Sequence, residues 1–84
     1  MTYEAICLIL DKAWENNSRA LIFVENEGRF EIDPKLWDWE MYDSINTLCI
    51  FNKDSKKESY IDINHISEIS IQLNDNSGDK EKGI

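Results

Sequence analysis

Residues 19–33 read RALIFVENEGRFEID, a pattern that predicts a β-hairpin. The first half is a run of apolar residues that favour strands, and in the second half Phe30 and Ile32 alternate with charged residues. Between the two runs, Asn26 and Gly28 are residue types that readily adopt the positive φ of a short hairpin loop. Two antiparallel strands joined by a tight turn are therefore expected.

On the N-terminal side of this hairpin, apolar residues recur at spacings of three and four, which predicts an amphipathic helix. The residues of this apolar stripe are Ile6, Cys7, Leu10, Ala13 and Trp14. Thr2 can cap the start of the helix, and the run Asn-Asn-Ser at 16–18 is typical of a helix end. Leu8 and Ile9 widen the stripe, so the helix is expected to be covered over much of its circumference.

On the C-terminal side, the apolar runs 45–51 and 60–63 flank the polar loop 52–58 and predict a second hairpin. A short polar break follows at 64–65. Residues 69–73 then alternate apolar and polar side chains, which indicates a last half-buried strand.

The length of 84 residues allows one domain with a single core. The expected fold is α+β, with an N-terminal helix packed on a small antiparallel sheet of about five strands. This domain is expected to span residues 1–73. Residues 74–84 have no periodic apolar pattern and are predicted to form a flexible tail.

The segment 59–71, SYIDINHISEISI, looks like the strand, tight turn and strand that close Sm-like and SH3-like barrels. Over residues 2–73 the order of elements also resembles small acidic proteins of the Rho-inhibitor type, which carry an N-terminal helix on an Sm-like barrel. This resemblance implies that the sheet can close into a barrel. Sm-like barrels serve both RNA binding and protein binding, and this chain lacks the evident basic rim of the RNA-binding members.

The charge balance is strongly acidic, with seventeen acidic residues, nine basic ones and a formal net charge of −8. Phosphate backbones are normally bound by Lys and Arg, so this balance disfavours direct nucleic-acid binding. Lys53, Lys56 and Lys57 form the one basic cluster, which Asp54 and Glu58 interrupt. The acidity instead favours a protein partner with a basic surface.

The segment 33–43, DPKLWDWEMYD, combines aromatic and acidic side chains at high density. Binding hot spots are enriched in Trp and Tyr, and surrounding acids can form a charged rim. The segment therefore predicts a partner-binding face. The residues assigned to this face are Glu31, Asp33, Trp37, Asp38, Trp39, Glu40, Tyr42 and Asp43.

The local structure of this segment stays open at the level of sequence. Asp33 and Pro34 are a good helix start, and a helix would put Leu36 and Trp39 on one face. A strand would instead align Trp39 with Trp37 and Met41. A further alternative is that the tryptophans plug one end of a small barrel while the acids face water.

Catalytic residues, a metal site and a cofactor site are not predicted. The single histidine, His65, lies in an expected turn, and no Gly-rich phosphate loop or zinc-ligand spacing is present. Cys7 and Cys49 lie inside apolar runs and are expected to be buried free thiols, which fits the cytoplasm, and a single disulfide between them stays open as the alternative. Neither a signal peptide nor a membrane-spanning segment is predicted.

The leading functional hypothesis is therefore a non-enzymatic inhibitor or adaptor that presents an acidic, aromatic surface to a basic partner. An inhibitor from a phage or mobile element, or an immunity protein that blocks a nucleic-acid-handling protein, fits the Asn-, Lys- and Ile-rich composition. One alternative is a small-ligand or RNA-binding barrel that uses the aromatics for stacking. Another is a self-assembling module whose strand edges pair between copies in a homo-oligomer.

Overall fold

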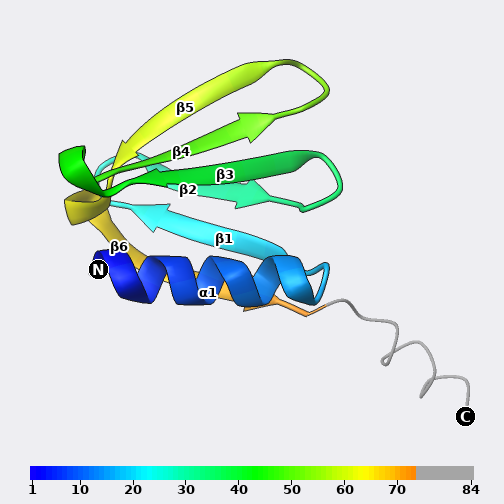
Figure 1. The fold of residues 1–84 in the computed structure, drawn as a ribbon, viewed down its shortest axis with the longest axis horizontal. Helices are drawn as coiled ribbons and strands as arrows, with labels where there is room; N and C mark the ends of the chain where they lie inside the picture. The colour runs from blue at the N-terminus through cyan, green and yellow to red at the C-terminus, as the bar shows by residue number, and fades with distance from the viewer. Residues whose placement is uncertain (74–84) are drawn as a thin grey trace, which may run out of the picture.

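A computed structural model describes residues 1–73, so the predicted C-terminal tail lies outside the described residues. Residues 1–73 form one α-helix, six strands and two short 3-10 helices, arranged as Figure 1 shows. In chain order these are α1 (Tyr3–Glu15), β1 (Arg19–Val24), β2 (Gly28–Ile32), β3 (Trp37–Tyr42), η1 (Asp43–Ile45), β4 (Thr47–Asn52), β5 (Lys57–Asp62), η2 (Ile63–His65) and β6 (Ile66–Gln72). The α+β class and the N-terminal helix are confirmed. The additional strand is β3, which forms from the aromatic and acidic segment.

The strands form two antiparallel sheets of three strands each, in the orders β2-β1-β6 and β3-β4-β5. The predicted first hairpin is β1 and β2, with Ile22 opposite Phe30, and its loop places Asn26 at φ 66° and Gly28 at φ 89°. The second predicted hairpin is β4 and β5. Within the described part of the chain, the ladders join strands inside each sheet only, and closure into a barrel is not shown.

The helix α1 begins and ends at the residues that its sequence predicts. The Thr2 side chain accepts a hydrogen bond of 3.1 Å from the Ala5 amide, and Asn16 follows the last helical residue as the C-cap. The helix lies against β1 and β6, away from the sheet β3-β4-β5 (Figure 1). Since it packs on one side only, the expectation of wide coverage is wrong for Leu8, whose side chain is 71% exposed.

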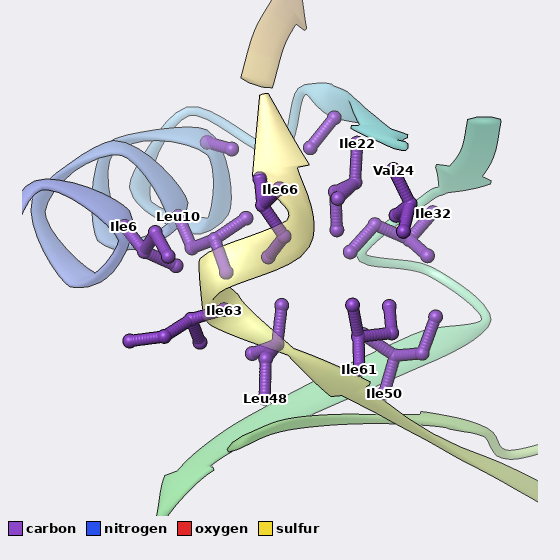
Figure 2. Close-up of a cluster of buried hydrophobic side chains, with 12 residues drawn as sticks. Ile6, Leu10, Ile22, Val24, Ile32, Leu48, Ile50, Ile61, Ile63 and Ile66 are labelled. Carbon is purple, nitrogen blue, oxygen red and sulfur yellow. The ribbon is translucent and has the colours of Figure 1, made fainter. Parts of the chain in front are cut away.

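One hydrophobic core joins the helix and both sheets. Alternate residues of each strand point inward, because successive side chains of a strand lie on opposite faces. In Figure 2 the side chains of Ile6 and Leu10 from α1 point toward those of Ile22 from β1 and Leu48 from β4. The fully buried members of this core are Ile6, Leu10, Ala13, Ala20, Ile22, Ile32, Leu48 and Ile50. The core therefore holds the second sheet in place although the two sheets share no ladder.

The break before the last strand is the 3-10 turn η2. The Asp62 side chain caps it by accepting a hydrogen bond of 2.9 Å from the Asn64 amide. The buried side chains of Ile63 and Ile66 belong to the hydrophobic core. The chain therefore passes from the second sheet to the first while its side chains stay packed in that core. In the described part of the chain, no helix has both the length and the apolar character needed to cross a membrane.

Candidate functional site

The strand β3 separates the two kinds of residue that the sequence places side by side. Trp37, Trp39 and Met41 are partly buried and pack against the core, whereas Asp38 and Glu40 are exposed. This alternation is that of a strand with one face on the core. Of the two alternatives, the strand that aligns Trp37, Trp39 and Met41 is therefore the one that forms.

The opposite face of β3-β4-β5 points away from the core and is organised by strand register. Three rows of residues lie across the strands in the order β3, β4, β5. The rows are Asp38, Phe51 and Glu58; Glu40, Cys49 and Tyr60; and Tyr42, Thr47 and Asp62. We refer to these nine residues as the outer face of the second sheet.

A groove of about 290 Å³ runs over this outer face. Its lining residues are Asp38, Trp39, Glu40, Tyr42, Cys49, Phe51 and Glu58. Cys49 and Phe51 come from the central strand, and Cys49 is small, so the centre of the sheet lies lower than its sides. The groove therefore has a thiol and an aromatic ring as its floor, and its walls include carboxylates and the Tyr42 phenol.

The two tyrosines of the outer face are ordered by contacts to each other and to neighbouring acids. The rings of Tyr42 and Tyr60 are stacked, with centroids 6.5 Å apart and planes at 21°. The Tyr60 hydroxyl donates a hydrogen bond of 2.8 Å to Oε1 of Glu58, and the Tyr42 hydroxyl makes a longer contact of 3.3 Å to Oε1 of Glu40. Each carboxylate is thereby held beside an aromatic ring.

The electrostatic environment of the groove is negative. The hydrogen bond to Glu58 and the charge of that carboxylate raise the pKa of Tyr60 to about 12, and the charge of Glu40 raises the pKa of Tyr42. Burial raises the pKa of the Cys49 thiol, and the carboxylates of Glu58 and Glu40 act in the same direction. The thiol is therefore protonated at neutral pH and is a poor nucleophile.

The carboxylates of the groove have no cationic partner among residues 1–73. The ion pair of that part of the chain is Arg19 Nη1 to Glu31 Oε2, at 2.9 Å, and it lies on the other sheet. The groove lining itself contains Asp38, Glu40 and Glu58 and no basic residue. The groove thus carries uncompensated negative charge.

The structure distributes the eight residues of the predicted partner-binding face over several places. Asp38, Glu40 and Tyr42 line the groove together, and Asp43 is exposed in the adjoining turn η1. Glu31 is paired with Arg19, and Asp33 orders the turn before β3 by accepting a hydrogen bond of 2.9 Å from the Lys35 amide. Trp37 and Trp39 pack against the core from the other face of β3, and Trp39 also borders the groove.

Six residues of the outer face were missed at the level of sequence: Thr47, Cys49, Phe51, Glu58, Tyr60 and Asp62. The alternation of side chains within β4 and β5 could have located some of these residues from the sequence. It could have placed Glu58 and Tyr60 on one face of one strand, but only the register across β4 aligns them with Glu40 and Asp38.

A second, smaller hollow of about 220 Å³ lies at the end of the first sheet. It is lined by Asn17, Arg19, Asp33, Lys35 and Gln72. Its side chains are polar, and Arg19 and Asp33 already have the partners described above. No set of three or more His, Cys, Asp or Glu side chains in residues 1–73 is placed to hold a metal ion.

Comparison of the chain with protein-family models, with curated proteins and with solved structures found no match.

Proposed function

We propose that the chain is a non-enzymatic protein-binding module and that the groove on the outer face of the second sheet is its binding surface. The observation that carries this proposal is the combination of stacked tyrosines with three carboxylates that have no cationic partner in the described residues. Such a surface complements a basic protein partner. Aromatic rings supply contact area, and the charges speed encounter and reject acidic competitors.

The chemistry of the groove supports binding over catalysis. The one nucleophilic side chain in its lining is Cys49, which is 6% exposed and whose pKa is raised by burial. A general base for this thiol would have to be a neighbouring carboxylate, and carboxylates raise the thiol pKa further. An inhibitor that covers the basic surface of a nucleic-acid-handling protein, in a phage or mobile element, is the setting that we propose.

The experiment that tests the function is affinity capture from a nuclease-treated lysate of the native host. The groove variant is Glu40→Gln/Glu58→Gln, and its matched control is Glu25→Gln/Glu27→Gln, which makes the same change in net charge at exposed positions of the first hairpin. We expect one protein to be retained by wild type and control and lost by the groove variant. Retention should also weaken as salt increases.

Two results would contradict the proposal. Capture of the same protein by the folded groove variant would show that the groove is not the contact surface. Binding of nucleotides or short RNAs, detected by tryptophan fluorescence in the absence of any captured protein, would favour the alternative class of RNA-binding or small-ligand barrels.

A further inference from the structure

The groove combines an apolar floor with carboxylates on two facing walls. Its walls stand on β3 and β5, which are separated by β4. Two strand spacings of about 4.8 Å put the wall backbones roughly 10 Å apart, and the groove between them has a volume of about 290 Å³. The floor is formed by Cys49 and Phe51, and it is apolar enough to receive a methylene stem.

The walls offer acceptors on both sides of this space. Asp38 and Glu40 project from β3, and Glu58 projects from β5. Carboxylates accept hydrogen bonds and do not donate them, so a bridging ligand must carry several donors that point in different directions. A guanidinium has five N–H donors in one plane, whereas an ammonium is a compact point charge with three.

The aromatic rings of the groove region also favour a guanidinium over an ammonium. Tyr42 and Tyr60 are held nearly parallel, and Phe51 lies in the groove between the strands that carry them. A guanidinium stacks on such rings through its flat face while its edges reach carboxylates. The hydrogen bond from Tyr60 to Glu58 fixes a ring and an acceptor relative to each other before the ligand arrives, which lowers the entropy cost of binding.

We propose that the groove recognises an arginine side chain of the basic partner, with the guanidinium between the carboxylates of β3 and β5 and against the tyrosine rings. The proposal rests on the proposed function, because it names the chemical group that the same surface binds. It assigns Asp38, Glu40 and Glu58 as acceptors and Tyr42, Tyr60 and Phe51 as the stacking surface.

The test is an NMR titration of the isotopically labelled full chain with oligo-arginine and with oligo-lysine peptides of equal length. We expect oligo-arginine to bind about threefold to tenfold more tightly. The shift changes should centre on the amides of Glu40, Cys49, Phe51 and Tyr60. The charge-matched control Glu25→Gln/Glu27→Gln should bind both peptides like wild type.

Two variants separate charge from stacking. Glu40→Gln/Glu58→Gln should weaken both peptides, since it removes attraction common to any cation. Tyr60→Thr keeps a residue that favours strands and should remove the preference for arginine while retaining lysine binding. The dispersion of each spectrum verifies that the variant is folded.

Equal affinity for the two peptides at the groove would overturn the arginine assignment and leave the basic-partner function standing. Shift changes spread over all acidic positions, with the groove variant binding as well as wild type, would overturn both. A preference for arginine that persists in Tyr60→Thr would contradict the stacking arrangement.

Discussion

The Tyr60 hydroxyl donates a 2.8 Å hydrogen bond to Oε1 of Glu58, which lies two residues earlier on the same face of the edge strand β5. This contact and the charge of Glu58 raise the pKa of Tyr60 from 10.0 to about 12. In the unfolded chain the phenol has its ordinary pKa, so between pH 10 and 12 the unfolded state loses this proton more readily. The contribution to stability is therefore complete below pH 10 and is lost as the pH rises toward 12.

This relationship predicts that Glu58→Gln lowers the pKa of Tyr60 toward 10.0, because the acceptor loses its charge. The measurement is an alkaline titration of phenolate absorbance. Subtracting the titration of Tyr60→Phe isolates the signal of this tyrosine from those of Tyr3 and Tyr42. An unchanged Tyr60 titration in Glu58→Gln would show that the charge of the Glu58 carboxylate does not raise the pKa of Tyr60.

The two leucines of α1 should differ in their contribution to stability. Leu10 is fully buried in the core and Leu8 is 71% exposed. We expect Leu10→Ala to lower the free energy of unfolding by about 2–5 kcal/mol through lost burial and a cavity. We expect Leu8→Ala to change it by less than about 0.5 kcal/mol. Urea denaturation measures both, and similar losses for the two variants would contradict the packing of one helix face.

Substitutions at two adjacent residues of β3 should differ in their effect on stability. Trp39 packs partly against the core, so Trp39→Ala should destabilise the protein by roughly 2 kcal/mol, less than the about 3–5 kcal/mol of a fully buried ring. Glu40 is exposed, so Glu40→Gln should leave stability within about 0.5 kcal/mol of wild type while weakening partner binding. Thermal denaturation compares the two. A stable Trp39→Ala protein with normal unfolding would place this tryptophan on the partner side.

The first hairpin loop depends on a backbone conformation and not on a side-chain contact. Gly28 has φ 89°, and an added Cβ would meet no atom within 4 Å. Gly28→Ala should therefore cost about 1–2 kcal/mol from backbone strain alone. Glu27→Ala, at the exposed neighbouring position, is the control and should be nearly neutral. Equal stability of the two variants, measured in urea, would contradict the positive φ at Gly28.

Much of the fold follows from local pattern. The helix is marked by Thr2 and Asn16, and the first hairpin by Asn26 and Gly28, since caps and positive-φ turns depend on residues close in the chain. The number of strands was harder to predict. The segment that becomes β3 carries both a helix-start signal at Asp33 and the alternation of a strand, and packing of its tryptophans on the core decides between them.

The candidate site could be predicted only in part. Asp38, Glu40 and Tyr42 have even spacing in one strand, so sequence alone places them together once β3 is taken as a strand. The sequence analysis assigned these residues and the tryptophans to one face. That assignment does not fit a strand, because adjacent residues of a strand point to opposite sides. Glu58 and Tyr60 come from the end of another hairpin, and their alignment with Glu40 depends on the register of both neighbours of β4.

The sequence by itself determined the α+β class, the position of the helix and first hairpin, the acidic charge and the aromatic density of β3, because each is a property of composition or of residues near in the chain. The tertiary structure decided which side of β3 faces water and which residues form the groove. Those outcomes depend on burial and on pairing between distant strands. A shift of one residue in either ladder would reverse the faces, so only the packed core selects the register that brings the carboxylates and tyrosines together.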